Sequence, residues 1–190
     1  GCLLLEKCLQ DVEGLTVEVH DNGWGDDEST FEDADAVVIY ADGGGKHPAL
    51  QGENLDTLKK LVDRGVGFGC MHYGVEVPPG VANREFQSWI GGHYENMYSC
   101  NPIWSPDFDS LPNHPVTRGV EPFSIKDEWY FNMRFIGGIE GNKPDQREGV
   151  SFTPILVAKA SDDVRDGPYV YPKGPYDHII ASSGRDEAMH

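Results

Sequence analysis

The chain has 190 residues, of which 38% are apolar and 25% are charged, as expected of a globular domain large enough to bury a core. Its formal net charge of −17 repels phosphate backbones, so we expect no nucleic-acid partner. No apolar run approaches the roughly 18 residues that a membrane span needs, and the acidic composition fits a secreted or periplasmic protein as well as a cytoplasmic one.

The N-terminal segment predicts a helix followed by a strand. Apolar residues share one stripe at helical spacing from Cys2 to Val12, and Gly14 is suited to cap the C-terminal end of this helix. Residues 15–19 then alternate apolar and polar side chains, which is typical of a strand with one buried face. We expect this strand to lie near a sheet edge.

The middle of the chain alternates between strand and helix patterns. Continuous apolar runs predict buried strands over 36–40 and 66–71, the first covered on both faces, and a late strand is expected over 154–158. Apolar residues at helical spacing predict helices over 54–64 and 84–90. Strands that alternate with helices favour a mostly parallel α/β sheet.

The periodicity is lost between residues 92 and 150, where Tyr, Trp, Asn, Pro and Gly are frequent. Long aromatic-rich segments without periodicity are usually functional loops in a compact domain. We therefore expect residues 92–135 to cover the carboxyl edge of the sheet and to form much of the wall of a binding site.

A first candidate binding segment follows the strand over 36–40. Ligands of open parallel sheets bind beyond the carboxyl ends of the strands, and Asp42, Gly43, Gly44 and His47 stand there. Glycines let the backbone turn tightly and approach a ligand. An ordinary tight turn explains the same pattern, and the segment is not a phosphate loop because neither Ser nor Thr follows its Gly-Lys pair.

A second candidate segment is the sharp turn after the strand over 66–71. A strand that turns directly into a helix forms an elbow, whose apex needs small residues two positions before and two after it. With Cys70 at the apex these would be Phe68 and His72, whereas with His72 at the apex they are Cys70 and Gly74. The spacing predicts His72 at the apex and Cys70 in the strand as an unreactive thiol, with a purely structural histidine as the alternative. The four cysteines form no Cys-x-x-Cys pair, which favours buried free thiols.

Four segments together resemble the successive motifs of the ThuA-like (trehalose-utilisation) family, in the class I glutamine amidotransferase-like superfamily: 65–74, 89–95, His114-Pro115-Val116-Thr117-Arg118-Gly119 and Asp127-Glu128-Trp129-Tyr130. The resemblance spans nearly the whole chain. It implies one domain over residues 1–190 with a flavodoxin-like three-layer α/β sandwich and a mostly parallel sheet. It also implies a bacterial protein of carbohydrate metabolism, with a histidine at the elbow where amidotransferases carry a cysteine.

Two departures from the family concern the ends of the chain. The family's first strand and its C-terminal end have no counterpart here, and the sequence starts at Gly1 without an initiator methionine. We therefore expect a piece of a longer chain that lacks both segments.

The resemblance leaves two functions open. The first is an enzyme acting on a disaccharide or keto-sugar derivative, with His72 as general base or metal ligand and Glu128 assisting. The second is a non-catalytic carbohydrate-binding or regulatory module on the same fold. A cysteine-dependent glutaminase is disfavoured by the elbow spacing, and the oligomeric state is left open.

The remaining candidate residues are polar or aromatic side chains in or beside these motifs. For the aromatic ones, core packing is the competing explanation. A divalent metal such as zinc could be held by His72, His93 and Glu128, although roles without a metal are favoured. We expect contacts with a small carbohydrate at Asp42, Gly43, Gly44, His47, Tyr73, His93, Tyr94, Trp104, Asp127, Trp129 and Tyr130.

Overall fold

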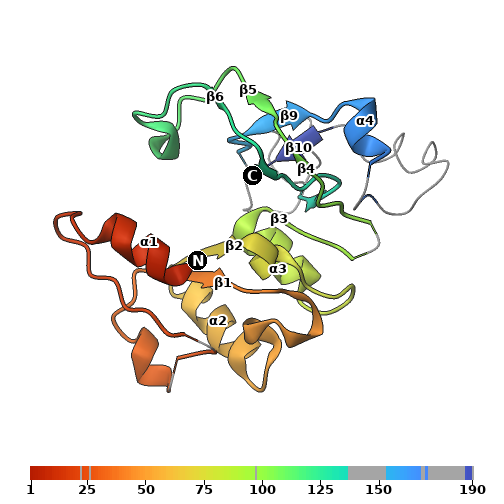
Figure 1. Ribbon diagram of the computed structural model, residues 1–190. Helices are drawn as coiled ribbons and strands as arrows, with labels where there is room; N and C mark the ends of the chain where they lie inside the picture. The colour runs from red at the N-terminus through yellow and green to blue at the C-terminus, as the bar shows by residue number, and fades with distance from the viewer. Residues whose placement is uncertain are drawn as a thin grey trace. The chain divides into compact units, whose positions relative to one another are not determined.

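The computed structural model describes residues 1–21, 23–25, 27–96, 98–136, 153–167, 170 and 187–189. They contain both helices and short strands, which makes the protein a mixed α/β structure. The chain divides into two compact units, Gly1–Arg84 and Glu85–His190, and each is described by itself (Figure 1). Within the described residues, no helix combines the length and the apolar character that crossing a bilayer requires.

The first unit is built on two parallel strands with a helix between them in the chain. Strand β1 pairs with β2 in parallel, from Ala36 opposite Gly67 to Tyr40 opposite Met71. Both strands begin and end within one residue of the predicted segments. In chain order the elements are α1 (Cys2–Leu9), η1 (Glu28–Phe31), β1 (Ala36–Tyr40), η2 (Gly44–Lys46), η3 (Pro48–Leu50), α2 (Asn54–Asp63), β2 (Gly67–Met71) and η4 (His72–Val75).

Helix α2 covers the strand pair with its apolar stripe. Leu58 and Leu61 are buried on it, and Leu61 packs with Phe31 and Val66 in the core of this unit. Each such side chain contributes about 1.5–3 kcal/mol when it leaves water. The helix ends where Gly65 takes a φ of 91° and donates its N–H to the Val62 carbonyl at 2.8 Å, as expected of a glycine cap.

Other expectations for the first unit are wrong. Helix α1 ends at Leu9, and residues 15–20 form neither helix nor strand. A strand needs a neighbour for its backbone groups, and within the described residues no strand pairs with this segment. The apolar run of β1 is also not covered on both faces, because Val38 is 45% exposed and Tyr40 is 42% exposed.

The second unit contains one long antiparallel arm in place of the expected irregular loops. Its strands pair successively as the chain runs out and returns, and the arm turns near the short helix η5 (Pro115–Thr117). The pairs are β3 (Gly92–His93) with β8 (Arg134–Phe135), β4 (Ile103–Trp104) with β7 (Asp127–Glu128), and β5 (Asp107–Phe108) with β6 (Phe123–Ser124).

The arm carries a bulge near its base. Seven positions lead from His93 to Cys100 on the outgoing side, whereas three lead from Phe131 to Arg134 on the returning side. The outgoing side therefore has four extra residues, which lie within 94–99. These residues must satisfy their backbone groups outside the ladder.

The remaining elements of the second unit precede and follow the arm in the chain. Helix α3 (Asn83–Ile90) leads into it and buries Phe86. The late strand is displaced from the predicted 154–158 to β9 (Val157–Lys159), which pairs with β10 (Glu187–Met189), and α4 (Asp162–Arg165) follows β9. The core of the unit is a cluster of Cys100, Trp104, Phe108, Trp129, Phe131, Ala160 and Val170.

The cap of α2 provides a direct test of this fold. Gly65→Ala should lower the free energy of unfolding by about 1 kcal/mol, because the left-handed conformation brings a Cβ too close to the backbone carbonyl oxygen. Apart from the adjoining residues, no atom of the described part of the chain lies within 4 Å of the added methyl group, so the loss is conformational and not steric. Gly45→Ala is the matched control, since it also has open space but no positive φ. Urea unfolding in which both variants behave alike would contradict the assigned cap.

Candidate functional site

The chain turns sharply at His72. Strand β2 ends at Met71, helix η4 begins at the next residue, and His72 has a φ of 55°. This left-handed conformation costs on the order of 1–3 kcal/mol for a residue other than glycine. His72 therefore stands at the apex of a strand-to-helix elbow, at the position that the spacing of small residues predicted.

The small residues around the apex have a clear steric reason. A Cβ on Gly74 would lie 2.7 Å from the carbonyl oxygen of Ile39 in β1, and a backbone atom cannot move aside easily. Two positions before the apex, Cys70 is half-buried in β2. Burial raises the pKa of the Cys70 thiol to about 12, so the thiolate needed for nucleophilic attack is scarce at neutral pH.

The imidazole of His72 is held by three neighbours. Its Nε2 atom lies 3.6 Å from Oδ1 of Asp42, its ring stacks on Tyr40 with a centroid distance of 5.4 Å, and the Tyr73 ring meets it edge-on at 5.0 Å. The His72 side chain is 31% exposed and that of Asp42 is fully exposed. The ring is thus oriented by its neighbours and still reached by solvent.

The glycine loop after β1 packs on the elbow. A Cβ on Gly43 would lie 2.3 Å from the Tyr73 carbonyl oxygen and 2.4 Å from Cβ of Glu76. Gly44 has a φ of 68° and donates its N–H to the Glu76 carbonyl at 3.0 Å. Burial raises the pKa of the Glu76 carboxyl, which brings a second acid–base group to this segment.

His47 does not fit the predicted contact with a substrate, because its side chain is fully buried. Its Nδ1 atom accepts the N–H of Ala49 at 3.0 Å, so Nε2 carries the proton and donates to the Gly74 carbonyl at 2.8 Å. Burial lowers the pKa of His47, which keeps the ring neutral.

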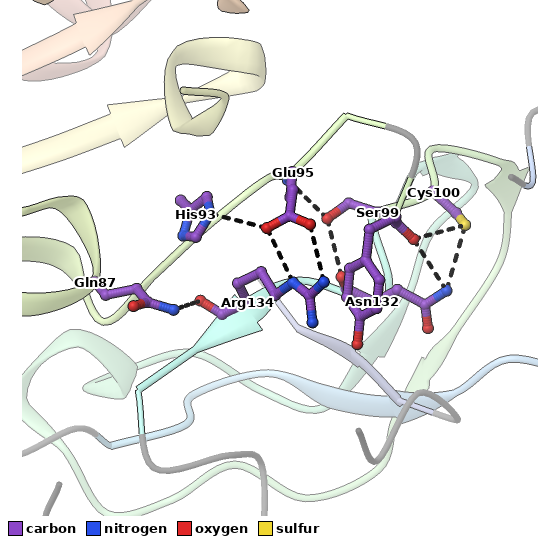
Figure 2. A network of polar contacts seen from close by, with 8 residues as sticks. Gln87, His93, Glu95, Ser99, Cys100, Asn132 and Arg134 are labelled. Atoms are coloured by element: carbon purple, nitrogen blue, oxygen red, sulfur yellow. Dashed lines mark hydrogen bonds and ion pairs between the residues drawn. The ribbon is translucent and has the colours of Figure 1, made fainter. Parts of the chain in front are cut away.

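A separate polar cluster closes the bulge of the arm in the second unit (Figure 2). The Arg134 guanidinium donates two hydrogen bonds to the Glu95 carboxylate, at 2.8 and 3.1 Å, and lies 3.2 Å from the centre of the Tyr98 ring. The Ser99 hydroxyl accepts the Glu95 N–H and donates to the Asn132 carbonyl, both at 2.9 Å. This network connects the extra residues of the bulge to the returning side of the arm.

His93 lies beside this network without a hydrogen bond. It is 1% exposed, and within the described residues neither ring nitrogen has a hydrogen-bond partner. Its Nε2 atom lies 3.8 Å from Oε2 of Glu95. Burial lowers the pKa of His93 more than the Glu95 carboxylate raises it. Oδ1 of Asn132 is also buried without a hydrogen-bond partner among the described residues, and Asn132 takes a φ of 58°.

Three of the predicted residues meet in a third cluster on the same arm. The Glu128 carboxylate accepts hydrogen bonds from the Asn101 amide at 3.1 Å and the Tyr130 hydroxyl at 3.0 Å. The Tyr94 hydroxyl donates to the side-chain oxygen Oδ1 of Asn101 at 3.3 Å, and the Tyr94 and Tyr130 rings meet edge-to-face with a centroid distance of 5.3 Å. Both tyrosines are buried, whereas Glu128 and Asn101 are half-buried.

The two tryptophans near this cluster belong to the core. Trp104 donates its indole N–H to the Trp129 carbonyl, and Trp129 donates its own to the Ile125 carbonyl. Both rings are over nine-tenths buried, so neither is available to stack on a sugar. Asp127 is exposed and accepts the N–H of Glu128 at 2.8 Å.

The predicted metal set is divided between the units. His72 belongs to the first unit, and His93 and Glu128 belong to the second. Among the residues that the structure describes, no group of three or more His, Cys, Asp or Glu side chains is arranged to hold a metal ion. Convergence of these three residues on a metal stays a prediction.

The residues that sequence reasoning missed are Tyr40, Glu76, Asn101 and Arg134. Tyr40 was assigned to a covered strand, yet its place at the carboxyl end of β1, next to Asp42, was a usable signal. The other three depend on pairing between distant segments and had no local signal. Comparison with protein-family models, curated proteins and solved structures gave no match.

The raised pKa of the Cys70 thiol leads to a labelling prediction. Cys70 should resist iodoacetamide at neutral pH because its pKa is raised to about 12 by burial. Cys8 is exposed, contrary to the expectation of four buried thiols, and serves as the reactive control. Mass spectrometry of the native protein should find Cys8 alkylated well before Cys70, and urea should remove the difference. Fast native labelling of Cys70 would overturn its assignment to the strand.

The lowered pKa of His47 leads to the prediction that acid destabilises the fold. Its folded-state pKa is lowered from 6.5, so just below that pH the unfolded chain binds a proton that the folded chain does not. The free energy of unfolding should therefore fall as the pH falls from 6.5 toward the folded-state pKa, with no contribution from His47 above this window.

The test is urea unfolding at several pH values between about 7.5 and 5. His47→Gln cannot titrate and should flatten the pH dependence, whereas His20→Gln, at a more exposed histidine, should not. Equal slopes for the wild type and His47→Gln would show that His47 is protonated equally in both states.

Proposed function

We propose that this chain is a carbohydrate-acting enzyme of the ThuA type, with His72 as its general base. The observation that carries the proposal is the strained φ of 55° at His72, combined with a partly exposed imidazole beside the Asp42 carboxylate. Strained residues that the surrounding structure holds in place are concentrated at active sites. The sequence motifs that resemble the ThuA-like family supply the substrate class, a disaccharide or keto-sugar derivative.

The chemistry follows from the surroundings of the ring. A carboxylate near Nε2 favours the tautomer with the proton on that nitrogen, so Nδ1 carries the lone pair. Such a base can take a proton from a sugar hydroxyl or from a carbon next to a carbonyl group. Tyr40 and Tyr73 restrict the rotation of the ring, which reduces the entropy lost when the base meets its substrate.

The proposal includes a flavodoxin-like three-layer sandwich with a mostly parallel sheet in a single domain. The parallel register of β1 with β2, and the helix α2 between them in the chain, support it. Apolar strand residues such as Val38 and Met71 are partly exposed, and a helix layer on each face of a larger sheet would cover them.

A non-catalytic carbohydrate-binding module is the second candidate. The half-buried amide and carboxylate of Asn101 and Glu128 lie within hydrogen-bond distance of each other. Such a pair offers adjacent donors and acceptors for the hydroxyl groups of a sugar. Glu128 would then act through binding, without a role in proton transfer.

His72→Asn separates the two candidates. Asparagine tolerates the left-handed conformation but is no base, so we expect a folded protein whose turnover of a reactive sugar falls about 10²- to 10⁴-fold. His20→Asn is the control and should leave turnover unchanged. The measurement is product formation from a panel of disaccharides and keto-sugars, with calorimetric binding alongside. Binding without turnover in the wild type would favour the module, and neither binding nor turnover would reject both candidates.

A further inference from the structure

The conformation of His72 must be maintained by contacts outside the residue itself. A left-handed φ at a non-glycine residue relaxes unless neighbouring groups prevent it. Gly74, two residues after the apex, is constrained in two ways. A Cβ on it would lie 2.7 Å from the Ile39 carbonyl oxygen of β1, and its own carbonyl accepts the hydrogen bond from Nε2 of His47.

His47 is itself held rigidly. Its backbone N–H donates to the Gly44 carbonyl at 3.0 Å, and its own carbonyl accepts from the Leu50 N–H at 2.9 Å and from the Gln51 side chain at 3.0 Å. The ring has no exposed surface, and both nitrogens bond within the chain. A donor fixed in this way is expected to hold its acceptor in place.

The loop and the elbow are joined at a second point. The Gly44 N–H donates to the Glu76 carbonyl at 3.0 Å, and Gly43 packs without a side chain against Tyr73 and Glu76. The two hydrogen bonds, from Gly44 and from His47, connect the loop 43–47 to the two ends of the segment 74–76. A shift of the loop would therefore be transmitted to the elbow.

We propose that His47 is a positioning residue, which ties the glycine loop to the elbow and thereby sets the backbone and ring orientation of His72. The inference deepens the proposed function because it concerns the same site. The competing explanation is that His47 serves only as the N-terminal cap of η3, through the hydrogen bond that Nδ1 accepts from Ala49.

The two ring nitrogens make different contacts, so two amide substitutions can separate these roles. His47→Asn keeps an acceptor near the position of Nδ1 and loses the donor to Gly74. His47→Gln keeps a donor near the position of Nε2 and loses the acceptor for Ala49. The two variants therefore serve as matched controls for each other.

The readout is nuclear magnetic resonance of the full chain, which needs no substrate. In His47→Asn we expect the His72 amide and ring signals to shift, and the Glu76 amide, which donates to the Tyr73 carbonyl, to exchange with solvent about two- to tenfold faster. In His47→Gln both should stay near the wild-type values. The reverse pattern, or equal changes in both variants, would overturn the proposal in favour of the cap or of simple packing.

The wild-type protein provides a check that does not depend on any variant folding. Nitrogen-15 spectra should show the His47 proton on Nε2 and slow to exchange, and a proton on Nδ1 would overturn the proposal. If a sugar is turned over, His47→Asn should lower kcat with little change in KM and His47→Gln should restore it. If no sugar is turned over, the proposed function fails while the resonance data still decide the role of His47.

Discussion

The close approach of the elbow to β1 is the constraint on which the first unit depends. Gly74 lies so near the Ile39 carbonyl that a single added carbon would stand 2.7 Å from it. The strand pair, the turn after β2 and the glycine loop can pack together only because side chains are absent at Gly74 and Gly43. His72 directly follows the carboxyl end of β2, two residues before Gly74, and has a φ of 55°.

The second unit depends on a different constraint, the excess of four residues on one side of its arm. The ladder cannot pair these residues, so the Glu95–Arg134 ion pair and the Ser99 hydroxyl join the bulge to the returning side. A forked, partly buried pair of this kind is stronger than an exposed one. Within the described residues, the buried ring nitrogens of His93 and Oδ1 of Asn132 have no hydrogen-bond partner, and a buried polar group without a partner costs about 1–3 kcal/mol.

The two polar clusters outside the elbow differ in what they offer to a ligand. In the cluster around Glu128, the half-buried carboxylate accepts a hydrogen bond from the half-buried amide of Asn101. The network of Glu95, Ser99 and Arg134 has His93 beside it, and this histidine has almost no exposed surface that a ligand could contact.

The sequence by itself determined the features that depend on near neighbours. The strands over 36–40 and 66–71, the helix over 54–64 and the apex at His72 were predicted because periodicity and the small residues around a turn are local properties. Cys70 was expected to lie in the strand for the same steric reason. The sequence also indicated the residues Tyr94, Glu128 and Tyr130 that meet on the arm, but it did not indicate Asn101, which joins them.

Only the tertiary structure decided which residues pair and which are buried. The segment 15–19 has a strand pattern but no partner within the described residues, so it forms no strand. His47 stands in a loop that suggested a ligand contact, yet it is buried because its ring bonds to Gly74, 27 positions away. Trp104 and Trp129 became core residues through strands that pair across the arm. Pairing and burial depend on segments distant in the chain, and a local pattern carries no information about them.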